Sequence, residues 1–319
     1  MRYLVTGGLG YLGEHLVAQL VRDNHEVVIF DVKSKSTSFN NQQIICVQGD
    51  LSNPHEIQKL LEFLPFDGVF HLAAVKSVEE SIKNPRLYIK VNCDGTENLA
   101  NFCLEYKISR VVYTSSAAVY GDSQETESVD EKCATAPKNP YGESKLMGEG
   151  VLYSFTKDEK FSSIALRCFN IVGAEIPSML NKSDSNILPI LVRRILGREI
   201  FEVFGNTYGT KDGSCIRDYV NVTDVATAHI LAMDYLANIP NPSFEKLNIS
   251  SGYGTSILEL IEMVEAASGM KLIQKIGPKR TGDPAQVIGN SSLARTLIKW
   301  EPRIQLRQSV TETLQAFKH

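Results

Sequence analysis

The chain has 319 residues and a formal net charge of −4, from 33 lysine and arginine and 37 aspartate and glutamate side chains. Apolar residues make up 43% of it, which excludes a disordered chain. Without a basic excess, neither nucleic acid nor an anionic membrane is an expected partner. The six scattered cysteines form no C-x-x-C pair, so we expect reduced thiols and no metal. No apolar run is long enough to cross a bilayer, and we expect a cytoplasmic globular protein.

The first half of the chain alternates short β-branched runs with longer amphipathic segments. The predicted strands are Tyr3–Thr6, Val27–Phe30, Ile44–Val47, Gly68–Leu72, Arg110–Thr114 and Ser163–Arg167. The predicted helices between them are Tyr11–Arg22, Pro54–Leu64, Pro85–Tyr106 and Pro140–Lys157. Strands with little internal alternation, separated by helices, indicate a parallel sheet covered on both faces. The predicted fold class is therefore α/β, with a Rossmann-type doubly wound parallel sheet.

After residue 170 the alternation of strands and helices becomes less regular. The helices predicted there are Ile187–Leu196, Val222–Leu236, Ser256–Ser268 and Leu306–Phe317. We expect residues 1–170 to form a nucleotide-binding domain and residues 171–319 a smaller C-terminal α/β domain that binds the substrate. Part of the segment 214–240 is expected to pack back onto the first domain.

A G-x-x-G-x-x-G turn follows the first predicted strand and opens directly into a helix. Gly7 allows the tight turn, Gly10 lets the backbone approach a pyrophosphate, and Gly13 lets the helix pack close to the strand. The positive end of the helix then binds the pyrophosphate. Asp31 ends the second strand about 20 residues further on, where a carboxylate binds the ribose hydroxyls of NAD and repels the extra phosphate of NADP. The motif predicts an NAD site and disfavours a reductase that uses free NADPH.

Two features near this predicted site stay open. Asp50 ends the third strand and is placed to bind adenine, but a turn or N-cap aspartate explains it equally well. Lys33 and Lys35 could soften the preference for NAD, although solvated loop lysines are the favoured interpretation.

Tyr141 and Lys145 form a Tyr-x-x-x-Lys pair near the start of a predicted helix. The spacing places both side chains on one helix face, roughly 5–6 Å apart at Cβ. An ammonium beside a phenol stabilises the phenolate, so we expect a lowered pKa for Tyr141 and a role as base for a sugar hydroxyl. Ser116 lies just past the end of the fifth strand, at the edge where doubly wound folds bind ligands. We expect it to donate a hydrogen bond to the substrate oxygen.

On these motifs the chain resembles the extended short-chain dehydrogenase/reductase superfamily, and within it the NAD-dependent epimerases of the UDP-glucose 4-epimerase family. The resemblance runs essentially end to end and is carried by segments 5–13, 71–81, 115–121, 140–146, 166–170 and 204–219. The glycine turn and the Tyr-x-x-x-Lys pair mark only the superfamily. Lys76 and the block from Phe204 to Tyr219 are more selective for the epimerases.

The resemblance implies an isomerase that inverts C4 of a UDP-hexose through a transient 4-keto sugar, with NAD as a resident cofactor. The implied catalytic residues are Ser116, Tyr141 and Lys145. The implied cofactor-binding residues are Gly7, Gly10, Tyr11, Leu12, Gly13, Asp31, Asp50, Leu51, Leu72, Ala73, Lys76, Asn92, Ser115, Tyr141, Lys145 and Cys168. The implied substrate-binding residues are Lys76, Ser116, Tyr141, Asn170, Asn186, Ile187, Phe204, Arg217, Arg280, Asp283 and Val287. Two phosphates require forked cationic donors, which favours this interpretation of the arginines over surface salt bridges.

Two residues depart from the family pattern. Cys168 replaces a tyrosine, so the nicotinamide carboxamide pocket is expected to differ slightly. Val287 falls where some members carry a tyrosine that limits room at the sugar's 2-substituent, which leaves the N-acetylated UDP-sugars open as substrates.

Two other functions remain as alternatives. A nucleotide-sugar dehydratase or decarboxylase needs a further acid/base pair, but Ala117 and Ala118 follow Ser116 and neither moves a proton. A non-catalytic protein that senses NAD or a UDP-sugar usually loses the tyrosine or the lysine, and both are present here.

The last expectation concerns assembly. The third and fourth helices carry apolar residues on more than one face, which predicts a homodimer with a four-helix seam. The residues expected to form it are Leu99, Phe102, Cys103, Leu146, Met147, Val151 and Leu152.

Overall fold

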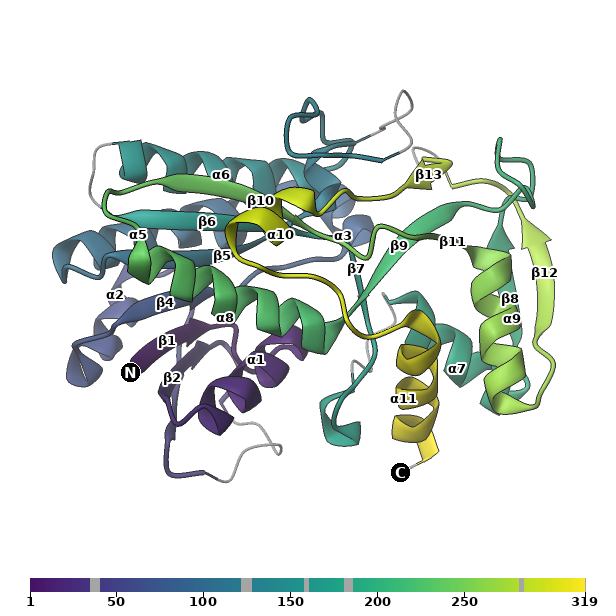
Figure 1. Cartoon of the computed structure of the whole chain (residues 1–319), viewed down its shortest axis with the longest axis horizontal. Helices are drawn as coiled ribbons and strands as arrows, with labels where there is room; N and C mark the ends of the chain where they lie inside the picture. Colours follow the sequence, from purple (N-terminus) through teal and green to yellow (C-terminus); the bar gives the residue numbers. More distant parts are fainter. Residues whose placement is uncertain (35–40, 122–127, 158–160, 181–185, 281–283, 319) are drawn as a thin grey trace.

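A seven-stranded parallel sheet forms the larger layer of the computed structural model, which describes residues 1–34, 41–121, 128–157, 161–180, 186–280 and 284–318 (Figure 1). The strand order is β10-β6-β5-β4-β1-β2-β3. Its strands are β1 (Arg2–Thr6), β2 (Glu26–Asp31), β3 (Ile44–Gln48), β4 (Gly68–His71), β5 (Arg110–Ser116), β6 (Ser162–Cys168) and β10 (Phe244–Ile249). The expected doubly wound α/β fold is confirmed.

Helices cover both faces of this sheet. Leu4 and Val5 are neighbours in β1, yet they enter opposite hydrophobic clusters because successive strand residues point to opposite faces. Helices α1 (Tyr11–Arg22), α8 (Val222–Asn238) and α10 (Ser292–Leu297) lie on the Val5 side, where Trp300 is buried. The segments on the Leu4 side are α2 (Pro54–Ile57), the 3-10 helix Gln58–Phe63, α5 (Gly95–Glu105) and α6 (Pro140–Lys157).

Several boundaries differ from those predicted. The segment expected as one helix over 54–64 is α2 followed by a 3-10 helix. The segment expected as one helix over 85–106 is α4 (Pro85–Ile89), a π-helical turn (Lys90–Asp94) and α5, preceded by an unpredicted α3 (Val78–Lys83). Strand β10 was also not predicted, because only its last three residues are buried and its first half carries Glu245 and Lys246.

The later part of the chain builds a smaller layer on the right of Figure 1. Its mixed sheet contains β7 (Asn170–Val172), β9 (Ile216–Asn221), β11 (Gly254–Ser256) and β13 (Gln286–Val287), and β8 (Ile200–Phe204) pairs with β12 (Ile273–Gly277). Helices α7 (Ile187–Gly197), α9 (Ile257–Ser268) and α11 (Leu306–Lys318) pack around a third cluster that includes Leu191, Leu260 and Leu314. Helix α8 returns to the first layer and contacts α1, where Gln19 donates to the Thr223 carbonyl.

Within these described ranges, no helix combines the length and apolar character that a bilayer span requires. Over the same residues, no group of three or more His, Cys, Asp or Glu side chains is arranged to hold a metal ion.

Candidate active site

The carboxyl ends of neighbouring strands bring many of the predicted site residues to one edge of the large sheet. Because the strands are parallel, their carboxyl ends meet at the same edge. The residues at or just beyond these ends are Gly7, Asp31, Leu72, Ser116 and Cys168. In the pairing of β5 with β6, Ser116 lies directly opposite Cys168.

The glycine turn is packed too closely for side chains. Gly7 has φ +71°, and a Cβ there would lie 2.6 Å from the backbone nitrogen of Ala73. A Cβ on Gly13 would overlap the Gly7 carbonyl oxygen. Gly10 is the N-cap of α1 and has no side chain, so the first N–H groups of this helix are left for a ligand. The turn is therefore a backbone cradle suited to a pyrophosphate.

Asp31 lies beside this cradle and is buried. Its carboxylate accepts hydrogen bonds from the backbone N–H groups of Leu9 and Lys33, each at 3.0 Å. The Lys33 ammonium donates to the Leu9 carbonyl at 2.9 Å. Lys33 is exposed, as a solvated loop lysine would be, but its side chain also folds back onto the glycine turn. Lys35 lies outside the described residues.

The turn contact considered for Asp50 is present, and its contact with adenine stays a prediction. Its Oδ1 accepts a hydrogen bond from the Ser52 N–H at 2.8 Å, which is a turn contact. Asp50 also lines a hollow of about 260 Å³ at the carboxyl ends of β2 and β3, next to Asp31. The other residues that line this hollow are Val32, Gln48, Gly49, Glu56 and Lys59. Leu51 next to it is buried.

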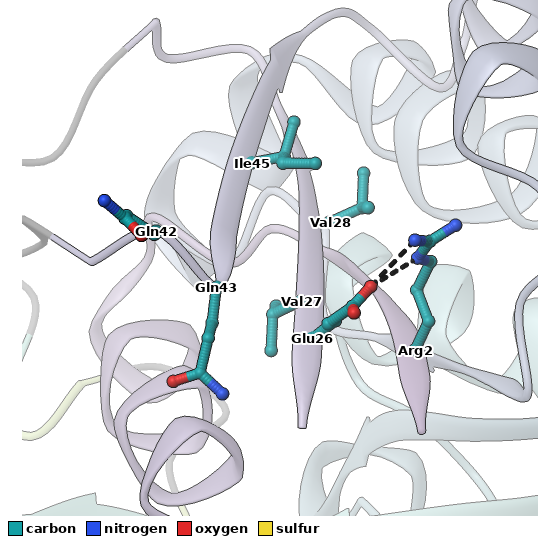
Figure 2. Close-up of a pocket in the computed structure, with 7 residues that line it drawn as sticks. All are labelled: Arg2, Glu26, Val27, Val28, Gln42, Gln43 and Ile45. Atoms are coloured by element: carbon teal, nitrogen blue, oxygen red, sulfur yellow. Dashed lines mark hydrogen bonds and ion pairs between the residues drawn. The ribbon is translucent and has the colours of Figure 1, made fainter. Parts of the chain in front are cut away.

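A second hollow, of about 150 Å³, lies at the opposite edge of the sheet (Figure 2). Arg2 and Glu26 begin β1 and β2, and their side chains form an ion pair at 2.8 Å. This hollow is therefore remote from the glycine turn, and it contains none of the predicted site residues.

The expected reacting groups lie together on the first turns of α6. Tyr141 forms a hydrogen bond with Ser116, and Tyr88 packs edge-on against its ring at 6.4 Å between ring centroids. One turn later, the Lys145 ammonium donates to the Thr114 carbonyl at 2.8 Å and lies 4.8 Å from the centre of the Tyr113 ring. The helix thus aligns a phenol and an ammonium along the end of β5.

The pKa values of this pair differ from the expectation. Burial raises the pKa of Tyr141, and the hydrogen bond with Ser116 only partly offsets that effect. Burial also lowers the pKa of Lys145, to about 8. The expected lowering of the Tyr141 pKa is therefore wrong for this structure, because desolvation outweighs the effect of Ser116.

Asn92 and Lys76 were expected to contact the cofactor. Asn92 is 1% exposed, and its side chain bonds the backbone N–H and carbonyl of Val75 and the Ser144 hydroxyl, each at 2.9 Å. This side chain therefore fastens the segment that carries Lys76 to helix α6. Lys76 lies within electrostatic range of Lys33, whose charge adds to desolvation in lowering the pKa of Lys76.

The other expected cofactor residues take defined places around the turn. The Leu72 N–H donates to the Thr6 carbonyl at 3.0 Å, which holds the end of β4 against the glycine turn. The Tyr11 hydroxyl donates to the Gly173 carbonyl, and Leu12 is buried in the core. The Ser115 hydroxyl is only 2.6 Å from Glu149, so this side chain points into the protein.

Apart from Lys76, Ser116 and Tyr141, the described residues expected to hold the UDP-sugar come from the smaller layer. Asn170 begins β7, Asn186 and Ile187 lie at the start of α7, and Phe204 ends β8. The Arg280 guanidinium lies 4.0 Å from the centre of the Phe204 ring. It also approaches Glu79 of α3 at 3.9 Å, which links the smaller layer to the segment that carries Lys76.

Arg217 and Val287 lie opposite each other in the paired strands β9 and β13. The Arg217 guanidinium donates to the carbonyls of Ile216 and Pro284. Next to it, buried Asp218 accepts hydrogen bonds from the N–H groups of Ser251, Gly252 and Gly289 and from the Ser251 hydroxyl. Asp283 lies outside the described residues.

Sequence reasoning missed the buried ion pair of Glu149 and Arg167. The Arg167 guanidinium contacts both oxygens of Glu149, at 2.7 and 2.9 Å. An arginine that is the single charged residue of a buried strand is a usable signal, since such a charge is almost never fully buried unless it is paired. Glu149 follows Lys145 by four residues and therefore shares its helix face.

These residues fit an NAD molecule. The glycine cradle suits a pyrophosphate, and a carboxylate at the end of β2 suits a ribose diol. Cys168 and Ser116 border the same edge as Tyr141.

The chain belongs to the NAD dependent epimerase/dehydratase family, whose model matches residues 3–250. A UDP-glucose 4-epimerase from Halalkalibacterium halodurans is 34% identical over 316 residues, which are 98% of this chain and 94% of that protein. The crystal structure of a UDP-glucose-4-epimerase from Stenotrophomonas maltophila, with bound NAD and formylated UDP-arabinopyranose, has a TM-score of 0.93 at 33% identity and covers 100% of this chain and 98% of its own. The UDP-Glc/GlcNAc 4-epimerase of Campylobacter jejuni has a TM-score of 0.85 at 32% identity and covers 99% of each chain. The expected resemblance to the UDP-glucose 4-epimerases is confirmed.

Proposed function

We propose that this protein is an NAD-dependent epimerase that inverts C4 of a UDP-hexose, with UDP-glucose and UDP-galactose as its basic substrate pair. The observation that carries the proposal is the contact between Tyr141 and Ser116, with Lys145 one helical turn away and the glycine cradle on the same strand edge. Full-length similarity to UDP-glucose 4-epimerases supports the assignment of the substrate.

The chain's own residues transfer the proton of the sugar's C4 hydroxyl and bind the diphosphate of the substrate. The chemistry that NAD supplies when bound is reversible hydride acceptance at C4 of the sugar. The Tyr141 oxygen, in its phenolate form, accepts the proton of the sugar's C4 hydroxyl and later returns it, with the Lys145 ammonium one helical turn away. Ser116 accepts a hydrogen bond from the Ala118 N–H, and its single proton, which interacts with Tyr141 in the free site, donates to the sugar oxygen once the substrate is bound. Arg217 and Arg280 provide forked donors for the diphosphate while the 4-keto sugar turns over.

The two alternatives receive less support. In the described structure, Ser116 runs directly into the 3-10 turn Ala117–Val119, whose alanines provide no second acid or base for an elimination. A purely sensing protein would not need a buried ammonium in register with a tyrosine, and Lys145 is 3% exposed. An epimerase therefore accounts for more of the site.

We extend the proposal to the N-acetylated UDP-sugars. Val287 lies opposite Arg217, so it is close to a residue proposed to hold UDP. A valine leaves more room there than a tyrosine would. The UDP-Glc/GlcNAc enzyme of Campylobacter jejuni is a relative of similar fold.

We also propose a homodimer, formed by a revised surface. Leu99, Phe102, Cys103 and Leu152 are at most 3% exposed, so these residues cannot form the seam. Leu87 on α4 and Met147 on α6 are 38% and 43% exposed, and α4 packs against α6. A second copy that covers these side chains would bury the apolar surface.

A cytoplasmic location completes the proposal. All six cysteines are free, and four of them are buried. Reduced thiols of this kind are typical of reducing compartments.

The proposal is tested by incubating the purified protein with UDP-galactose or with UDP-N-acetylgalactosamine, without added cofactor, and separating the products. We expect UDP-glucose and UDP-N-acetylglucosamine, respectively, together with NAD released on denaturation. A 4-keto-6-deoxy product would instead identify a lyase.

A further inference from the structure

A buried ion pair lies one helical turn beyond the reacting groups. The side chains of Glu149 and Arg167 are 4% and 2% exposed, and their closest atoms are 2.7 Å apart. Removing both charges from water opposes folding, so a gain in stability does not by itself explain the pair. Its geometry suggests a different reason for its presence.

Glu149 extends the line of functional side chains on α6. Tyr141, Lys145 and Glu149 are spaced four residues apart, so they share one face of the helix. Together they contact three consecutive residues of β5. The Lys145 ammonium donates to the Thr114 carbonyl, Glu149 accepts a hydrogen bond from the Ser115 hydroxyl at 2.6 Å, and Tyr141 interacts with Ser116. Three contacts therefore fix the position of α6 along β5.

Arg167 extends this set of contacts beyond helix α6. Its Nη1 donates to the Tyr120 hydroxyl at 2.9 Å, and that hydroxyl donates to the Asn248 side chain of β10 at 2.7 Å. Tyr120 directly follows the 3-10 turn that begins after Ser116. The same network therefore holds α6, the turn behind Ser116 and the strand next to β6.

We propose that Glu149 is a positioning residue for the epimerase reaction, which holds Tyr141 and Lys145 at the register where Tyr141 meets Ser116. This inference rests on the proposed function. It assigns Ser115 and Arg167 to the same unit, as the partners through which Glu149 holds the helix.

Glu149 also contributes its charge to the site. The groups that face the Lys145 ammonium are Glu149 on its own helix, Cys168 on β6, the Tyr113 ring and the Thr114 carbonyl on β5, and His71 on β4. Glu149 raises the pKa of Lys145 against the larger effect of burial. Neutralising Glu149 should therefore make Lys145 lose its proton at a lower pH.

The test compares Glu149→Gln, Ser115→Ala and the control Asp224→Asn with the wild type. Asp224 is a buried carboxylate that accepts the N–H groups of Arg303 and Ile304, away from α6. Steady-state rates on UDP-galactose are measured across pH and normalised to folded, NAD-containing protein. For Glu149→Gln we expect kcat to fall by about 10- to 100-fold with KM near wild type, because a small misplacement of reacting groups has effects of this order.

The variants distinguish the positioning of Tyr141 and Lys145 from the effect of the Glu149 charge on Lys145. Glu149→Gln should also shift the alkaline limb of the kcat profile to lower pH. Ser115→Ala keeps the carboxylate, so it should lower kcat while the limb stays in place. Asp224→Asn should lose stability but keep the wild-type kcat and pH profile.

Two results would overturn the positioning role: a wild-type kcat and pH profile in Glu149→Gln, or a wild-type kcat in Ser115→Ala. If Glu149→Gln does not fold, the kcat of Ser115→Ala decides. A wild-type protein that is inactive on every UDP-hexose would contradict the proposed function itself and, with it, this inference.

Discussion

The Lys145 ammonium donates a hydrogen bond to the backbone carbonyl of Thr114, 2.8 Å away, inside the protein. Burial lowers the pKa of Lys145 from 10.5 to about 8, so the ammonium loses its proton at a lower pH in the folded state than in the unfolded state. Between these two values the unfolded state binds more protons, and the contribution of Lys145 to the unfolding free energy rises with pH.

We therefore predict that Lys145→Met flattens the pH dependence of stability between pH 8 and 10. The wild type should gain unfolding free energy relative to the variant as pH rises through this window. Chemical denaturation at several pH values measures the difference, with Lys83→Met on exposed α3 as the control. A wild type and variant whose stabilities run parallel would contradict the buried, depressed ammonium.

The second prediction concerns the base. Tyr141→Phe should retain the fold and NAD, because only one hydroxyl is removed, but turnover should fall by about 10²- to 10⁴-fold. Tyr153→Phe removes a hydroxyl from an exposed position on the same helix and should leave the rate unchanged. Initial rates on UDP-galactose measure both. Undiminished activity of Tyr141→Phe would refute the proposed proton transfer.

The third prediction concerns acid stability. Burial lowers the pKa of His71 to about 3 and that of His229 to about 4, so both stay neutral in the fold while their unfolded forms protonate near 6.5. Stability should fall as pH drops from about 6.5 towards 4, by up to roughly 1.4 kcal/mol per pH unit for each histidine.

His229→Gln should make the unfolding free energy less dependent on pH in this range, because the contribution of one histidine is lost. His55→Gln, at an exposed site on α2, should leave the slope unchanged. Urea denaturation between pH 4 and 7 compares the three proteins. The same slope in all of them would mean that His229 does not stay neutral in the fold.

The fourth prediction concerns the sugar's 2-substituent. Val287→Tyr adds a phenol ring opposite Arg217 and should depress activity on the N-acetylated UDP-sugars while sparing UDP-galactose. An apolar wall discriminates weakly, by about 1–3 kcal/mol for each misfitting group, so the two kcat/KM values should diverge by roughly 10- to 200-fold. Val287→Ile is the matched control. Equal losses on both substrates would place residue 287 elsewhere in the site.

The fifth prediction concerns assembly. Leu87→Glu or Met147→Glu places a charge in the proposed dimer seam, and the protein should become a monomer in light scattering. Ile276→Glu on exposed β12 is the control and should leave the mass unchanged. A monomeric wild type at micromolar concentration would rule out the dimer.

Several features were predictable because they depend only on neighbours along the chain. Residue periodicity predicted six strands of the large sheet. Five of them are buried and need an apolar run whatever their partners are, and the edge strand β3 carries such a run although it is largely exposed. The spacing of Gly7, Gly10 and Gly13 predicted a tight turn at a helix start. The four-residue interval from Tyr141 to Lys145 placed them on one helix face, as the structure has them.

Other features required the tertiary structure, because they depend on contacts between residues that are far apart in sequence. Strand β10 is half polar and becomes a strand only by pairing with β6. Asn92 looks like any polar helix residue until its side chain bonds Val75 and Ser144. No local pattern measures desolvation, which here raises the pKa of Tyr141.

The sequence by itself determined which chemistry this protein carries: a glycine turn, a carboxylate at the end of the second strand, and a phenol and an ammonium on one helix face. The tertiary structure alone decided how these groups are held, through the packing of Glu149 and Arg167 beneath them and the return of β10 to the sheet. The physical reason is that side-chain type and spacing are local properties, whereas burial and charge pairing exist only once distant segments meet.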